Sequence, residues 1–362
     1  MLILDSHCDT PSQIMRLRNL AVDNPRGHVD FPKLKAGGVD ASFFALFTPQ
    51  SMTPDAATRY ALQMLAGVHD QVEACPGEVH MAFSPEDIYN NKDKSLVSIL
   101  LGMENGLPIG NSLSLLREFY RCGVRYMTLT HNGDNQIADS AAGNCTWNGL
   151  SPFGMEVVAE MNRLGMIVDL AHSSDKTFWD VLEASSVPVV STHSCCRALA
   201  SHRRNMTDDM IRAMAERGGC IQINFYPVFL SDSFARVLAG SGLEDEADAA
   251  EAEFIADPSA PQKRERWYHF EDKLAALPRP GVKEIADHID HAVKVGGIDH
   301  VGIGSDFDGI SVTPSGLENI SKIGLVFDEL TRRGYSSDSV DKIAGGNFLR
   351  VFREVQNGAK IG

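Results

Sequence analysis

The chain lacks long apolar runs and the short motifs of several common enzyme classes. No stretch of its 362 residues approaches the ~20 consecutive apolar residues that span a bilayer. GxSxG, HExxH and a P-loop GxxxxGK followed by Ser or Thr are all absent. These absences argue against a serine-hydrolase elbow, a zincin helix and a phosphate-binding loop.

Cysteine is scarce, and acidic residues outnumber basic ones. The seven cysteines are irregularly spaced and form no CxxC pair, so we expect neither a disulfide framework nor a zinc ribbon. Lys and Arg total 33 against 48 Asp and Glu, and the resulting charge of −15 disfavours nucleic-acid binding. Neither a signal peptide nor a lipid-anchor tail is recognisable, so we expect a cytoplasmic protein with no membrane partner.

Short apolar runs alternate with amphipathic stretches. The runs predicted to be buried strands are 2–4, 41–47, 96–103, 124–129, 166–171, 187–191, 220–225 and 300–304. The predicted helices are 56–73, 112–122, 153–164, 207–217, 283–295 and 318–332. Such alternation indicates a parallel sheet, and eight units predict one α/β domain over residues 1–362, a (β/α)8 TIM-like barrel. An open doubly wound sheet is the alternative.

Residues 227–281 interrupt the alternation before the last strand. An acidic, Ala-rich stretch, GLEDEADAAEAEFIAD, precedes the basic and aromatic KRERWYHF. We predict a helical insertion whose opposite charges pair along it. A lid over the site or a subunit contact is the functional alternative.

Residues that can bind metals or move protons follow six of the predicted strands. They are His7 and Asp9 after the first run, Glu104 after the third, His131 after the fourth, His172 after the fifth, His193 after the sixth and Asp306 after the last. The carboxyl ends of barrel strands face one side, where active sites lie. Any one such histidine is better explained as a hydrogen-bonded strand end, but six such ends together predict a shared site.

These residue types predict a metal centre of the hydrolytic kind. Histidines and carboxylates without clustered cysteines suit zinc, with manganese and cobalt as alternatives. A mononuclear catalytic zinc has three protein ligands. The larger ligand set here therefore predicts two divalent ions, with the ligands His7, Asp9, Glu104, His172 and His193. Glu104 is the natural bridge because its strand lies between the two ligand groups. Two such ions would hold a hydroxide at neutral pH and polarise a carbonyl.

Two further pairs have competing interpretations. Cys195 and Cys196 could bind a soft metal, but small buried residues are the favoured interpretation. Arg203 and Arg204 could form salt bridges at a helix entry or clamp a substrate carboxylate, since arginine binds carboxylates in a bidentate manner. The sequence does not separate the last two possibilities.

Long motifs extend over almost the whole chain: DSHCDT, GMENG, RYMTLTHN, GLSPFGMEVVAEMNRLGMIVDLAHSS, VVSTHSCCRAL, HRRNMTDDMI, INFYP, ADHIDH, GIGSDFDG and GGNFLRVF. In these motifs the chain resembles the membrane (renal) dipeptidases, metallopeptidases of the amidohydrolase-like barrel group. The resemblance implies a dinuclear zinc enzyme that cleaves dipeptides, including those with a D-residue in second position. His7 and Asp9 would bind one zinc, His172 and His193 the other, and Glu104 would bridge them.

The resemblance also implies how the substrate is held. His131 would hydrogen-bond the scissile carbonyl and stabilise the oxyanion. Arg204, with Arg203 beside it, would bind the C-terminal carboxylate. Asp306 would receive the α-amino group and pass a proton to the leaving nitrogen. The role of His202 is left unassigned.

The sequence departs from the mammalian family members in some respects. Those enzymes are exported and lipid-anchored, and the Asn132-Gly133 pair after His131 offers no disulfide cysteine. One alternative function is a related binuclear amidohydrolase acting on an N-acyl amino acid, a cyclic amide or a β-lactam. A non-catalytic metal- or peptide-binding protein is another. A homodimer is expected only because dimers are the commonest soluble assembly.

Overall fold

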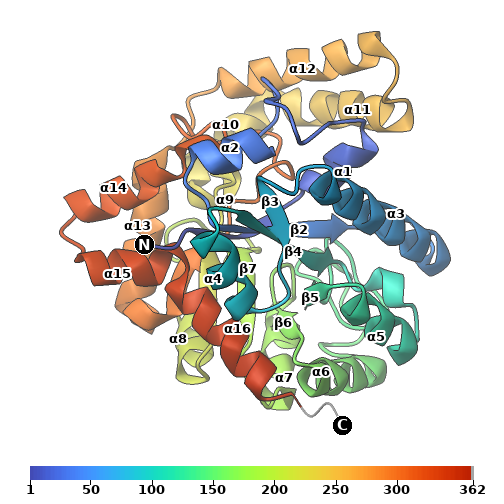
Figure 1. Ribbon diagram of the computed structural model, residues 1–362, viewed down its shortest axis with the longest axis vertical. Coiled ribbons are helices and arrows are strands. Elements are labelled where there is room, and N and C mark those ends of the chain that lie inside the picture. The colour runs from blue at the N-terminus through green and yellow to red at the C-terminus, as the bar shows by residue number, and fades with distance from the viewer. Residues whose placement is uncertain (360–362) are drawn as a thin grey trace.

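The computed structural model describes residues 1–359 (Figure 1). Eight parallel strands pair in chain order: β1 (Leu4–Cys8), β2 (Ala41–Phe47), β4 (Val97–Glu104), β5 (Val124–Thr128), β6 (Ile167–Asp169), β7 (Val190–Ser194), β8 (Cys220–Ile223) and β9 (Val301–Ile303). A short extra strand, β3 (Val79–Met81), pairs with β4. The amide of Asp9 donates to the carbonyl of Phe307 at 2.8 Å, which brings β1 beside the end of β9. The sheet is thus a nearly closed TIM-like barrel, as predicted.

Helices surround the barrel and follow most strands. Those before the insertion are α1 (Thr10–Met15), α2 (Phe31–Ala36), α3 (Pro54–Glu73), α4 (Pro85–Asp93), α5 (Leu113–Arg121), α6 (Pro152–Leu164), α7 (Asp175–Ala184) and α8 (Asp208–Glu216). Those after it are α13 (Val282–Gly296), α14 (Gly324–Arg332), α15 (Ser337–Asp341) and α16 (Asn347–Asn357). The α8 start was recognisable because Thr207 caps it, accepting a hydrogen bond from the Met210 amide.

Several predicted boundaries were wrong. The stretch 318–332 is not one helix but a 3₁₀ turn, Ile320–Lys322, followed by α14. β1 lies at Leu4–Cys8 rather than 2–4, and β7 at Val190–Ser194 rather than 187–191. Both strands extend into polar sequence because neighbouring strands and loops satisfy those polar groups, which an apolar-run criterion cannot detect.

Side chains alternate between two layers of core. On β4, Leu100 points into an inner cluster, whereas Leu101 joins the outer layer beneath the helices. The inner cluster includes Phe348 and Phe352 of α16, which pack against Phe43 with ring centroids 5.3 and 6.1 Å apart. Because α16 covers the amino ends of the strands, the carboxyl ends are left for the site.

The segment before the last strand is helical, as predicted. It contains α9 (Pro227–Leu230), α10 (Asp232–Ser241), α11 (Leu243–Ala256) and α12 (Pro261–Ala275), with α11 and α12 side by side at one end of the molecule (Figure 1). Its charges pair as expected: Arg266 on α12 contacts Glu253 on α11 at 2.5 Å. No described helix, here or elsewhere in residues 1–359, has the length and apolar character needed to cross a membrane.

Candidate active site

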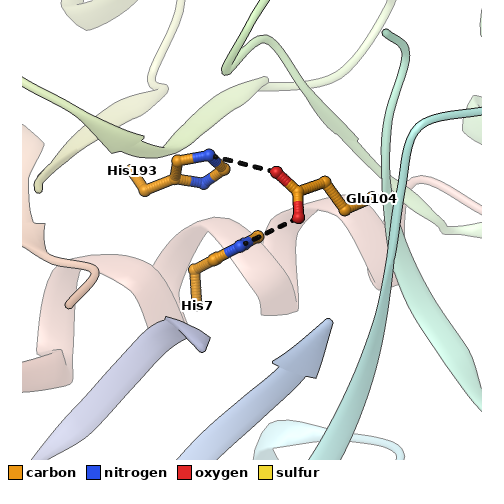
Figure 2. Close-up of side chains that lie close together, drawn as sticks. All are labelled: His7, Glu104 and His193. Carbon is orange, nitrogen blue, oxygen red and sulfur yellow. Dashed lines mark ion pairs between the residues drawn. The ribbon is translucent and has the colours of Figure 1, made fainter. Parts of the chain in front are cut away.

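Six strand ends bring the predicted residues together at the carboxyl face of the barrel. Glu104 ends β4 at the centre, and Figure 2 shows imidazoles from β1 and β7 pointing toward its carboxylate. The ligand atoms form three overlapping groups, each within 4.8 Å: His7, Glu104 and His193; Glu104, His131 and His172; His7, Asp9 and Asp306. All five predicted metal ligands are buried.

The two carboxylate oxygens of Glu104 face different histidines. Oε2 lies 3.5 Å from His7 Nε2. Oε1 lies 3.1 Å from His172 Nε2 and 3.5 Å from His193 Nε2. His131 Nε2 is farther away, 3.8 Å from Oε1. This geometry suits a carboxylate that contacts two ligand groups at once.

Asp9 and Asp306 complete the side of the site near β1. His7 Nε2 lies 3.4 Å from an Asp9 oxygen and 4.0 Å from an Asp306 oxygen. Burial raises the pKa of both carboxyl groups to about 7, and the repulsion between neighbouring carboxylates adds to the effect. Asn224 Nδ2 donates to Asp306 at 2.9 Å and holds that carboxylate in place.

The Nδ1 atom of each predicted ligand histidine is already hydrogen-bonded. His7 Nδ1 lies 2.8 Å from Tyr126 Oη, and His193 Nδ1 lies 2.9 Å from Thr192 Oγ1. His172 Nδ1 donates to Asn132 Oδ1 at 3.1 Å. In each ring the Nε2 atom is therefore the one that faces the centre, which is the usual arrangement of metal-binding histidines.

These contacts show that a cation fits the site. His172 Nε2 and His193 Nε2 are only 3.0 Å apart, and with both Nδ1 atoms protonated their lone pairs face each other. His7 Nε2 is buried and has no hydrogen-bond partner among residues 1–359. Facing lone pairs and an orphaned buried nitrogen are unfavourable by themselves, and shared cations would relieve both.

His131 belongs to the group of Glu104 and His172, whereas Arg204 lies beside the ligands. Burial, with Arg204 nearby, lowers the pKa of His131 to about 3, so its imidazole is neutral at pH 7. Burial also lowers the pKa of Arg204 to about 10, which leaves it charged. Arg204 Nη2 donates to the His193 carbonyl at 3.2 Å, and its Nε has no hydrogen-bond partner in the part of the chain that the structure describes. Its guanidinium lies 5.3 Å from the Phe229 ring centre.

The two residues beside Arg204 differ from it. Arg203 is exposed and does not join the buried cluster. His202 packs against Phe229 with ring centroids 4.7 Å apart, and its Nδ1 accepts from the Arg204 amide at 3.2 Å. His202 thus supports the turn that carries Arg204. The cysteine pair nearby, Cys195 and Cys196, is fully buried with free thiols, as favoured from sequence.

A cavity of about 370 Å³ opens above the cluster. His131, Asp306 and Glu104 lie at its base, whereas Glu244, Asp248, Glu251 and Trp267 from α11 and α12 form its outer wall. Arg16, directly after α1, joins barrel and insertion, because it pairs with Glu251 at 2.8 Å and lies 5.4 Å from the Trp267 ring centre. Residues of the insertion therefore line the cavity, and a role as a lid or a subunit contact stays a prediction.

The loops around the site have unusual backbone conformations. His172 and Asp306 have φ angles of 65° and 62°, in the left-handed region that side chains other than glycine seldom adopt. Such conformations persist where the surrounding structure holds them and cluster at functional sites. Gly309 approaches the site so closely that a Cβ there would lie 2.0 Å from Asp9 Oδ2.

Several polar residues of the site were missed in the sequence. Tyr126, Asn132, Thr192 and Asn224 contact the predicted residues rather than the centre of the site, and Asp169 contacts Thr192. For Asn132, Thr192 and Asn224 only a position at or near a strand end could have drawn attention to them, and Tyr126, in the middle of β5, offered no such signal. Their partners depend on pairing between strands, which the sequence pattern does not specify.

Comparison with known proteins identifies the family. The family model for membrane dipeptidase (Peptidase family M19) matches residues 1–361. The chain belongs to this family. Dipeptidase aclJ of Aspergillus oryzae is 34% identical over 347 residues, covering 93% of this chain and 72% of the relative. Dipeptidase verJ of Clonostachys rogersoniana is 31% identical over 371 residues, covering 98% and 84%.

Solved structures agree with the fold. The crystal structure of the probable dipeptidase PvdM from Pseudomonas aeruginosa has a TM-score of 0.85 at 30% identity, covering 99% of this chain and 96% of that one. A Rhodobacter sphaeroides metallo peptidase shares the fold at 23% identity with a TM-score of 0.81, covering 98% of this chain and 99% of that one. The protein is thus a metallo-dipeptidase, a hydrolase, which argues against the non-catalytic alternative.

Proposed function

We propose that this dipeptidase binds two divalent ions, zinc being favoured, and uses them to hydrolyse the peptide bond of dipeptides. The proposed ligands are His7, Asp9, Glu104, His172 and His193. The position of Glu104 carries the proposal, because its two oxygens face different histidines. When bound, the ions would supply an activated water as nucleophile and a Lewis acid for the carbonyl.

His131 is the proposed donor to the carbonyl oxygen. It lines the cavity, and its low pKa keeps the imidazole neutral at the pH of the reaction. A neutral N–H donor stabilises negative charge as it develops on the oxygen without bringing a further cation into the site. Phe47 and His172 pack against the ring, with ring centroids 4.6 and 4.2 Å from that of His131.

Two opposite charges, on Asp306 and Arg204, are proposed to select dipeptides by binding both charged ends of the substrate. Asp306 would bind the α-ammonium group and pass a proton to the leaving nitrogen, while Arg204 would bind the C-terminal carboxylate. Asn224 orients Asp306, and Arg204 is buried with an Nε that no described residue hydrogen-bonds. A longer peptide would leave one of these buried charges unpaired, at a cost of several kcal/mol. Arg203 stays a predicted neighbour of the carboxylate.

Dipeptides with a D-residue in second position are proposed as substrates as well. The Rhodobacter sphaeroides metallo peptidase was solved with a phosphinate mimic of L-Ala-D-Ala. The carboxylate and ammonium groups of an L,D-dipeptide offer the same two charges as those of an L,L-dipeptide, so the same pair of residues could bind both.

A hydrolysis panel tests the proposal. Metal-loaded enzyme should cleave L,L- and L,D-dipeptides, lose activity after treatment with a chelator and regain it with added Zn²⁺. Tripeptides should be poor substrates. Metal analysis should find two ions per chain; a fully active enzyme with no bound metal would disprove the proposal.

N-acetylated dipeptides separate this function from a related hydrolase acting on another amide. Acetylation removes the charge that Asp306 is proposed to bind, so kcat/KM should fall strongly. Efficient cleavage of N-acyl amino acids, cyclic amides or β-lactams in place of dipeptides would favour the alternative. The expected homodimer and cytoplasmic location stay predictions, and light scattering of the purified protein tests the first.

A further inference from the structure

A buried hydrogen-bond chain connects a carboxylate of the barrel to one of the proposed metal ligands. Thr192 Oγ1 lies 2.7 Å from Asp169 Oδ2 and 2.9 Å from His193 Nδ1. The three side chains come from β6 and β7 and are at most 1% exposed. The metal-binding proposal makes no use of Asp169 or Thr192.

The direction of each hydrogen bond follows from the groups involved. Asp169 Oδ1 accepts from the backbone amides of Ala171 and Thr192, at 3.0 and 2.8 Å. Its Oδ2 accepts from Thr128 Oγ1 at 2.5 Å and from Thr192 Oγ1. A carboxylate has no proton to donate, so the Thr192 hydroxyl gives its only proton to Asp169. Toward His193 that hydroxyl can therefore only accept.

We propose that Asp169 and Thr192 are positioning residues that fix His193 in the tautomer with Nδ1 protonated and Nε2 free to bind a metal ion. The inference rests on the proposed metal centre. The Nε2 lone pair then faces Glu104 Oε1 at 3.5 Å. A carboxylate behind a ligating histidine also strengthens that ligand, here through one hydroxyl.

The other two proposed ligand histidines have no carboxylate linked to Nδ1 through a hydroxyl in the described residues. His7 Nδ1 contacts the neutral hydroxyl of Tyr126, and His172 Nδ1 contacts the neutral amide of Asn132. His193 alone among the three has a carboxylate one hydroxyl away in the described residues. Loss of Asp169 should therefore weaken the ion held by His193 more than the ion held by His7.

Asp169→Asn should reverse the direction of the hydrogen bonds between residue 169, Thr192 and His193. The backbone amides at the Oδ1 position can only donate, so the new amide must keep its oxygen there and turn its NH₂ toward the two threonine hydroxyls. Thr192 would then accept from Asn and donate to His193 Nδ1. The proton of His193 would move to Nε2, the atom that must bind the metal.

The test is Zn²⁺ binding by the metal-free full-length protein in competition with a chromophoric chelator. We expect Asp169→Asn and Thr192→Val to weaken one of the two ions about 10- to 100-fold and leave the other near its wild-type affinity. Thr192→Ser keeps the hydroxyl and should restore binding to within about threefold of wild type.

Thr128→Val is the matched control. It removes the other hydroxyl from the same carboxylate oxygen but does not touch His193. Its zinc affinities should stay within about threefold of wild type, even if its thermal stability falls. Should Asp169→Asn fail to fold, the comparison of Thr192→Val with Thr192→Ser decides the question.

The outcomes separate this inference from the proposed function. Two ions bound with wild-type affinity by Thr192→Val would overturn the inference and leave the proposed function standing. Equal weakening of zinc binding by Thr128→Val and Thr192→Val would also overturn it. The effect would then come from losing either hydroxyl at Asp169 and not from the contact with His193. A wild-type protein that binds no Zn²⁺ would overturn the proposed function, and the inference with it.

Discussion

Arg204 is a buried cation that forms no ion pair with any residue of 1–359, although carboxylates crowd the adjacent site. Burying an unpaired charge is costly, so a fold that retains one usually uses it. Phe229 and the His193 carbonyl hold the guanidinium in place. A free carboxylate from the substrate would complete its hydrogen bonding.

Arg204→Ala should lower kcat/KM for dipeptides by about 10- to 100-fold, the range expected when a charged hydrogen bond is lost. C-terminally amidated dipeptides should be affected much less. Arg212→Ala is the matched control, because Arg212 carries the same charge on an exposed side chain of α8. Equal losses in both variants would contradict an individual role for Arg204. Steady-state kinetics on the two substrate series gives the answer.

Gly102 on β4 makes room for Tyr126, whose hydroxyl contacts His7. A Cβ at Gly102 would lie 2.0 Å from the Tyr126 ring. Gly102→Ala should therefore lower the free energy of unfolding by about 1–3 kcal/mol, as overpacking does, and should weaken metal binding by moving Tyr126. In Gly77→Ala the new methyl group meets nothing within 4 Å. Urea denaturation should find this control within about 0.5 kcal/mol of wild type.

At the scale of elements, α5 and α6 are joined by a charged cluster. Glu160 of α6 accepts from Arg117 of α5 at 2.5 Å and from Arg163 at 2.8 and 2.9 Å. These bonds, first those of Arg163, lower the pKa of Glu160 to about 2 although burial opposes them. Because the pKa is lowered on folding, the cluster stabilises fully above pH 4.5 and less as the pH falls toward 2.

Glu160→Gln should lower the free energy of unfolding by about 1–2 kcal/mol at pH 7, a value reduced for the partial exposure of both arginines. The difference from wild type should shrink as the pH is lowered from 4.5 toward 2. Glu118→Gln breaks the exposed pair with Arg121 on α5 and should cost at most about 0.5 kcal/mol. A pH-independent difference in urea unfolding would rule out this account of Glu160.

For the whole molecule, the insertion and the barrel meet at Arg16. Its contacts with Glu251 and Trp267 hold α11 and α12 over the cavity. A second contact lies farther out, where Arg26 pairs with Asp272 of α12 at 2.5 and 2.8 Å. The position of the insertion therefore depends on a few polar contacts as well as on apolar packing. The insertion's own apolar cluster includes Phe234, Phe270 and Leu274.

Arg16→Ala should loosen the insertion. We expect faster limited proteolysis within 243–275 and a KM for dipeptides raised by about two- to tenfold, with kcat changed less, since one partly buried pair contributes about 1 kcal/mol. Arg236→Ala removes an equal charge from an exposed position on α10 and is the control. Unchanged proteolysis and KM in Arg16→Ala would show that the insertion is held by its packing alone.

The sequence by itself determined the strand–helix alternation, the barrel class, the helical insertion and the residues that meet at the site. Apolar periodicity and strand-end chemistry are local signals, and six strand ends carried the same kind of residue. The long motifs pointed to the dipeptidase family, which the family comparison bears out. Strand limits such as those of β1 and β7 were not recoverable, because polar residues there are satisfied by neighbouring strands.

Only the tertiary structure decided which residues support the site. Tyr126 contacts His7 across strands that are distant in sequence, and Asp169 on β6 reaches His193 on β7 through Thr192. It also separated Arg204 from Arg203, since one is buried and the other exposed. The physical reason is that hydrogen bonds and burial depend on which side chains the strand register brings together, and adjacent residues in a chain do not share that environment.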